Sequence, residues 1–127
     1  MTVTLSNISA GIPFEITDLV DKGTPILPNF PAFSFSSTGD NTIVAAVPGK
    51  RIKVVQIMMT ADAQATVKFT DGAGGSVLCG PQSMVEGVPL VFPFCSLGWM
   101  ITSVNTAFVV NFSDATNIGG CVCHLEF

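Results

Sequence analysis

From residue 41 onward, short runs of apolar and β-branched residues alternate with turn residues. The runs are four to ten residues long, and none repeats with the 3.6-residue period of an amphipathic helix. Runs of this kind at regular spacing are typical of an antiparallel sandwich or a jelly roll. The sequence therefore predicts an all-β domain of about eight strands, at residues 42–47, 52–61, 65–70, 76–79, 89–94, 99–102, 108–112 and 121–127.

The final run, over residues 121–127, shows the clearest alternation. Successive side chains of a strand point to opposite faces. We expect the first of the two faces, which begins with Cys121, to form the core. We expect His124, on the second face, to lie in solvent or in an interface. We also expect this strand to pair within a sheet, because an open apolar edge promotes aggregation. The first face carries Cys121, Cys123, Leu125 and Phe127, and the second carries Val122, His124 and Glu126.

Residues 1–38 show no sustained period and contain four of the eight prolines. Proline fixes φ, removes a backbone donor and favours extended geometry in the residue before it. Apolar and aromatic residues are still frequent, whereas flexible linkers have few of them. We therefore predict an extended N-terminal arm over residues 1–38 and a β-sandwich domain over residues 39–127. The arm either lies on another molecule or wraps its own domain, and the sequence leaves both open.

The chain carries few charges for its length of 127 residues. Five Lys or Arg and nine Asp or Glu make up 11% of the residues, whereas soluble domains average about 25%. Apolar residues make up 48%, and the mean hydropathy is +0.59. A surface with so little charge is poorly hydrated, which predicts that much of it is covered by copies of the chain or by a partner.

The distribution of charge and hydropathy argues against two classes of partner. The net charge is −4, and Lys50, Arg51 and Lys53 are the only basic cluster. A nucleic-acid-binding protein needs a basic face, which this chain lacks. The uncharged run at 87–111 contains two prolines and a central glycine, so it predicts strands rather than a membrane-spanning helix. We expect neither nucleic acid nor a membrane as a partner.

The four cysteines are an even number, which leaves disulfide bridges open. Residues 1–11 have neither the cationic start nor the long apolar core of a secretory signal. We therefore expect a reducing compartment and buried thiols rather than bridges. The cysteines are Cys79, Cys95, Cys121 and Cys123.

The residue pattern is not typical of catalysis. The single histidine, His124, would have to serve any Ser-His-Asp or Cys-His device, and no G-x-S-x-G motif is present. Zinc binding by Cys121, Cys123 and His124 is disfavoured, because a strand sends the imidazole to the opposite face from the sulfurs. The nine carboxylates fall mostly in expected turns, and one Trp without any Tyr disfavours a sugar-cleaving groove. We expect no enzyme, and no catalytic, cofactor-binding or metal-binding residue.

Two further motifs have simple structural interpretations. The Gly-rich stretch at 71–75 is followed by neither a helix nor Lys-Ser/Thr, so it predicts a hairpin turn rather than a phosphate-binding loop. The cluster of Lys50, Arg51 and Lys53 stands at the start of an expected strand. It either solvates a strand edge and discourages pairing there, or contacts carboxylates of a partner.

Five segments of the chain form a wider pattern: AAVPGKRIKVVQ (45–56), TVKFTDG (66–72), LCGPQSM (78–84), PLVFPFCSLGW (89–99) and IGGCVCHLEF (118–127). A basic strand start after Gly-Lys is followed by Pro-Phe and Gly-Trp, and Gly-Gly precedes the last strand. This pattern resembles the small β-sandwich capsid decoration (cement) proteins of tailed bacteriophages. The resemblance covers residues 42–127, not the arm. The Cys-x-Cys of the last strand departs from the family pattern and leaves a bridge or an intersubunit contact open.

The resemblance implies a structural virion protein on the outer surface of a capsid, synthesised in the host cytoplasm. Such proteins bind the major capsid protein as homotrimers and stabilise the contacts between capsomers. The alternative is a receptor- or glycan-binding module of a phage fibre or tail. A threefold contact would bury either the strand of Met58 and Met59 or the region of Trp99. From the arm and the basic cluster, we expect the partner interface to include Pro28, Phe30, Phe33, Phe35, Lys50, Arg51 and Lys53.

Overall fold

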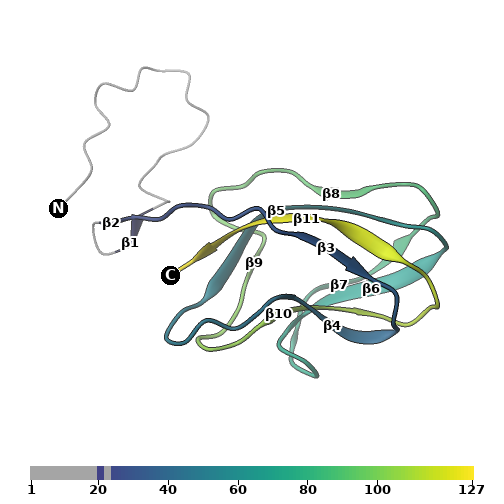
Figure 1. Cartoon of the computed structure of the whole chain (residues 1–127), viewed down its shortest axis with the longest axis horizontal. Coiled ribbons are helices and arrows are strands. Elements are labelled where there is room, and N and C mark those ends of the chain that lie inside the picture. Colours follow the sequence, from purple (N-terminus) through teal and green to yellow (C-terminus); the bar gives the residue numbers. More distant parts are fainter. Residues whose placement is uncertain (1–19, 22–23) are drawn as a thin grey trace, which may run out of the picture.

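The computed structural model describes residues 20–21 and 24–127, and these residues form strands, turns and loops without a helix. Nine of the strands build two antiparallel sheets packed as a sandwich (Figure 1). The predicted all-β sandwich is therefore confirmed. The strands are β1 (Val20–Asp21), β2 (Thr24–Pro25), β3 (Ala32–Phe35), β4 (Gly39–Val44), β5 (Ile52–Ala61), β6 (Ala65–Asp71), β7 (Val77–Met84), β8 (Leu90–Phe92), β9 (Met100–Ile101), β10 (Phe108–Phe112) and β11 (Ile118–Glu126).

The connectivity of the two sheets is that of a jelly roll. One sheet has the order β3-β11-β5-β8, with β9 paired to the same strand β5 as β8, and the other has the order β4-β10-β6-β7. Apart from the hairpin between β6 and β7 and the step from β8 to β9, each connection from β3 onward crosses from one sheet to the other. All eight predicted strands overlap with strands β4 to β11, and β3 is an additional one.

The core lies between the two sheets and contains mostly β-branched, aromatic and methionine side chains. Strand β5 sends Ile57 and Met59 into it, and the facing sheet contributes Phe69 and Phe108, whose stacked rings have centroids 5.4 Å apart. All four side chains are almost completely buried. Complete burial of one such side chain contributes about 1.5–3 kcal/mol to the free energy of folding.

A β-bulge in β5 changes which residues of that strand face the core. Gln56 pairs with Cys123 and Val54 pairs with His124, so Val55 is an extra residue without a partner of its own. Val55 joins Cys123 and Leu125 in a second, small buried cluster, against which Ile26 packs. This second cluster lies on the outer face of the five-stranded sheet.

The predicted alternation of the last strand is confirmed, but the prediction of which face meets the core is wrong. Val122 belongs to the core between the sheets, and His124, on the same face, is only 3% exposed. Cys123 and Leu125 point outward and are nevertheless buried, because the segment around Ile26 covers them. Both faces of β11 are therefore covered from Val122 to Leu125, and His124 is neither solvated nor at an exposed surface.

Part of the expected arm belongs to the sheet. Strand β3 pairs with β11 from Ala32 to Phe35, and the pairing continues to Asn29, whose N–H donates to the His124 carbonyl at 2.9 Å. The N–H of Val122 donates to the Pro31 carbonyl at 3.0 Å. The segment 29–35 thus wraps its own domain, so the sheet begins before the expected boundary at residue 38. The arm residues 1–19 and 22–23 lie outside the described part of the chain.

Candidate interaction surface

The outer face of the five-stranded sheet presents a row of small and apolar side chains. Cys121 is paired with Ala32 on one side and with Met58 on the other, and Met58 is paired with Val91. Met58 and Val91 are each 47% exposed. Phe30 stands two residues before Ala32 on the same extended segment, so it points to the same side, and it is 67% exposed. We call these five residues the apolar face.

The strands that form the apolar face contribute very little charge to it. By register, the outward-pointing residues of β3, β5, β8, β9 and β11 include a single charged residue, Lys53, which pairs with Ile101 near one end of β5. The outer face of the four-stranded sheet is different. There Asn111 pairs with Asp40 and with Lys68, and Thr66 pairs with Ser83.

The edge of the five-stranded sheet beside β5 carries an exposed apolar loop at residues 93–99. The Cys95 N–H donates to the Val55 carbonyl at 2.8 Å, and the Trp99 N–H donates to the Val54 carbonyl at 2.7 Å. These two bonds hold both ends of the loop against β5 while its middle projects outward. Leu97 is 72% exposed and Trp99 47%. The loop is therefore a fixed apolar projection.

The Trp99 indole is held in place although half of it is exposed. Its Nε1–H donates to the Pro93 carbonyl at 2.6 Å, and its ring lies 5.4 Å from the ring of Phe92. Aromatic side chains with a satisfied polar atom lose little entropy on binding, which makes them effective contact residues.

One member of the basic cluster, Lys53, borders this loop. Lys50 and Arg51 are exposed, and Lys53 is half-buried. The Lys53 side chain lies against Gly98, where a Cβ atom would approach the Lys53 Cγ to 2.6 Å. Within the described part of the chain, the one ion pair joins His124 and Glu126, so none of the three cations has a carboxylate partner there.

The structure separates the four arm residues of the predicted interface. Phe30 is exposed and Pro28 half-buried, so both are accessible. Phe33 is only 8% exposed in the core, and Phe35 packs against it with ring centroids 5.7 Å apart. The alternation of β3 directs these two rings between the sheets. The prediction of Phe33 and Phe35 as contact residues for a partner therefore does not fit this structure.

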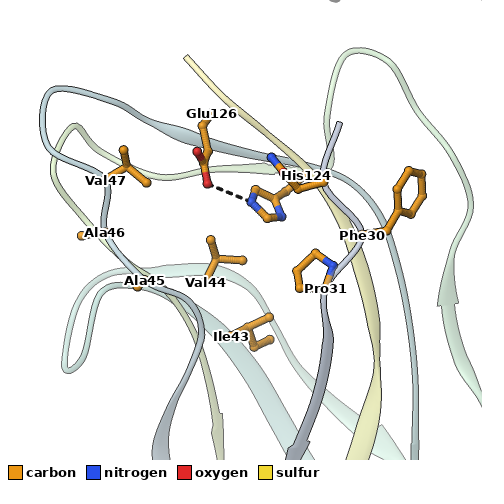
Figure 2. A pocket seen from close by; sticks show the side chains of 10 residues that line it. Phe30, Pro31, Ile43, Val44, Ala45, Ala46, Val47, His124 and Glu126 are labelled. Carbon is orange, nitrogen blue, oxygen red and sulfur yellow. Dashed lines mark hydrogen bonds and ion pairs between the residues drawn. The ribbon is translucent and has the colours of Figure 1, made fainter. Parts of the chain in front are cut away.

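A pocket of about 470 Å³ opens between the two sheets beside β11. Figure 2 shows Phe30 and Pro31 on one side of it and the segment from Ile43 to Val47 on the other. His124 and Glu126 stand at one end, with 3.2 Å between His124 Nε2 and Glu126 Oε1. The His124 Nδ1 is buried and has no hydrogen-bond partner.

The four cysteines are free thiols with different environments. Cys123 is buried, and the other three are half-buried. Burial, and to a smaller extent the neighbouring Cys121, raises the pKa of the Cys123 thiol. The described residues contain no group of three His, Cys, Asp or Glu side chains arranged to hold a metal ion.

Most carboxylates with described positions accept hydrogen bonds from loops of the same chain. Asp62 accepts from the backbone N–H of Asn117 at 2.8 Å and from the Thr116 hydroxyl at 2.8 Å, and its pKa is lowered mainly by these bonds. Asp40, Asp71 and Asp114 each accept a backbone N–H, from Gly74, Ser103 and Thr66. The turn role expected from the sequence accounts for these four side chains.

The described residues contain no helix long and apolar enough to cross a membrane. No protein-family model, no curated protein and no solved structure matches the chain. We therefore infer the function from the surfaces of this molecule itself.

Proposed function

We propose that the protein is a structural virion protein, a capsid decoration (cement) protein that binds the outer surface of a phage head as a homotrimer. The observation that carries this proposal is the apolar face, an exposed and nearly uncharged row across one sheet. Contiguous exposed apolar surface on a small domain marks a contact surface. In the proposed role, the apolar face and its Phe30 end lie against the major capsid protein.

The proposal agrees with the physical character of the chain. Jelly rolls occur in viral capsid domains and also in lectins and cupins, so the fold permits this function without selecting it. A single contact of modest area binds weakly after the entropy of association is subtracted. Many copies on a regular lattice, each engaging neighbouring capsomers, bind firmly through avidity. Such a protein needs a stable scaffold and a contact face, and it needs no catalytic site.

The first test is the number of copies in each particle. Quantitative mass spectrometry of purified virions gives the ratio of this chain to the major capsid protein. We expect a ratio within a few-fold of one, because multivalent binding to a lattice needs many copies on it. A handful of copies per particle would instead favour the receptor- or glycan-binding module of a fibre or tail and would refute the proposed role.

The second test changes the apolar face directly. Deleting residues 1–38 would also remove β3 and the core residue Phe33, so a point change is more informative. We expect Phe30→Asp to weaken binding to undecorated heads at least about tenfold, since it places a charge in a desolvated contact. The matched control is Val77→Asp on β7, an apolar residue of the other sheet that is 47% exposed. Equal binding by both variants would show that Phe30 is not part of the contact.

A further inference from the structure

We infer that copies of this chain contact one another through the two ends of the β8–β9 edge. The loop that carries Glu86 in one copy docks on the basic cluster and the 93–99 loop of the next. This inference rests on the proposed function, in which the chain acts as an oligomer, and it names the surfaces that join the copies.

Glu86 is distinguished by having no partner within the described part of its own chain. Asp40, Asp62, Asp71 and Asp114 each accept a backbone hydrogen bond from a distant part of the chain. Glu126 pairs with His124. Of the carboxylates whose side chains are described, Glu86 alone has neither a hydrogen bond nor an ion pair. It is exposed, and it lies between Val85 and Val88, which are 59% and 55% exposed.

The basic cluster is the counterpart of this loop. Lys50, Arg51 and Lys53 are three of the five cations, and no described carboxylate pairs with them. Lys53 lies against Gly98, whose neighbours Leu97 and Trp99 are exposed and apolar. Each end of the edge therefore combines unpaired charge with exposed apolar side chains, and the two ends are opposite in sign.

These two ends cannot meet within one molecule. The loop of Glu86 is fixed at the far end of β5, where the Gly87 N–H donates to the Ala61 carbonyl at 2.9 Å. The basic cluster lies at the near end, where Lys53 pairs with Ile101. The ten residues of β5 separate them by about 30 Å at roughly 3.3 Å per residue. Contact between them therefore requires a second copy.

The two components of the contact have different roles. Burying Val85, Val88, Leu97 and Trp99 supplies most of the favourable free energy, because exposed ion pairs contribute little. The charges fix the register and the choice of partner. Since the contact joins one end of a copy to the other end of the next, it is heterologous and produces a ring when the rotation closes. A homotrimer is the smallest closed ring above a dimer.

The test uses charge reversal and rescue in the full chain. We would measure native mass by light scattering on a sizing column, at low salt, for the wild type, for Glu86→Lys and for Lys50→Glu with Arg51→Glu. A fourth protein combines all three changes, which restores opposite charges across the contact. The control is Lys68→Glu, on the outer face of the other sheet. Circular dichroism melts show that each variant is folded.

We expect the wild type and the control to have a mass close to three times 13.3 kDa. Each reversal alone should raise the dissociation constant at least about tenfold, and the combined protein should recover most of the loss. Three results would overturn the inference: a monomeric wild type, a Glu86→Lys variant that assembles like the wild type, or a folded combined variant that remains dissociated. Binding of the same proteins to undecorated heads is measured separately, so the proposed role on the shell can stand when this contact fails.

Discussion

The outer faces of the two sheets differ far more than their inner faces do. Both inner faces supply apolar side chains to one core. Outside, the four-stranded sheet presents a polar row, in which the Asn111 side chain donates to Asp40 at 2.9 Å. The five-stranded sheet presents the apolar face, with Met58 and Val91 half exposed.

This difference separates the apolar positions that the fold requires from those that it does not require. A sandwich needs alternation with apolar residues inward and polar residues outward, and the four-stranded sheet follows it except at Val77 and Val109. Nothing in the folding of the five-stranded sheet requires Met58 or Val91 to be apolar, because both remain half exposed. An apolar outer face is therefore best explained by a contact outside the described part of this molecule.

The largest expected effect is a difference in the free energy of unfolding between a substitution in the core and one on the apolar face. Phe69 is completely buried and stacks on Phe108, so Phe69→Ala should lower the free energy of unfolding by about 3–5 kcal/mol. Met58→Ala on the apolar face should lower it by less than about 1 kcal/mol, because little buried surface is lost. Urea unfolding of both variants measures the difference. A comparable loss for Met58→Ala would mean that the apolar face serves stability of the monomer.

A smaller effect is expected where the turn after β5 is bonded to the loop before β11. Asp62 follows β5 and accepts bonds from Asn117 and Thr116, just before β11, and these bonds lower its pKa. A lowered pKa in the folded state stabilises the fold above the ordinary value of 3.8, and this contribution disappears as the pH falls through the lowered pKa. Asp62→Asn should therefore reduce Tm at pH 7 and reduce it less below pH 4.

The matched control for this turn is Lys68→Gln, which removes a charge that has no ion-pair partner among the described residues and lies outside the proposed contact between copies. Its Tm at pH 7 should equal that of the wild type. Thermal melts of both variants across pH provide the test. An equal loss of Tm by the two variants at every pH would contradict this role of Asp62.

The smallest expected effect is a difference in labelling rate between two cysteines of β11. Cys121 is half-buried on the apolar face, whereas Cys123 is buried beneath Ile26 and its pKa is raised. Thiolates are the reactive form, so we expect iodoacetamide to label Cys121 before Cys123 in the free protein. Binding to heads should then protect Cys121 and leave the slow rate at Cys123 unchanged. Mass spectrometry of labelled peptides follows both rates, and equal labelling of Cys121 in both states would place it outside the contact.

Strands were predictable where local patterns determine them. The runs that form β5 and β10 are rich in β-branched and aromatic residues, and such residues favour pleated, half-buried positions. Strand β3 was missed because its four residues follow Pro31 in a proline-rich segment, although Ala32 to Phe35 does alternate. A proline immediately before an edge strand is compatible with pairing, and that signal was available.

The faces of β11 were not predictable from its own residues. Alternation distinguishes two faces, but which face meets the core depends on distant segments. Here Ile26 covers Cys123 and Leu125, and the bulge at Val55 changes the register opposite them. The same limit applies to Glu86. Its lack of a partner becomes visible only when the long-range bonds of the other carboxylates, such as Asp62 with Asn117, are known.

The basic cluster was recognisable from the sequence because cations are scarce in this chain. The residues beside it were not recognisable, because long-range contacts bring them there. Gly98 of the 93–99 loop lies against Lys53, and Ile101 of β9 pairs with Lys53. Scarcity of charge thus predicts a contact surface, and the fold supplies the residues that we propose for it.

In the proposed role, the apolar face, and not the polar outer face, meets the partner. The most direct measurement compares Met58→Asp with Thr42→Asp in binding to undecorated heads. Thr42 is exposed on the outer face of the other sheet and pairs with Val109. We expect Met58→Asp to abolish binding and Thr42→Asp to bind normally, while both variants melt like the wild type. Normal binding by a folded Met58→Asp variant would contradict the account.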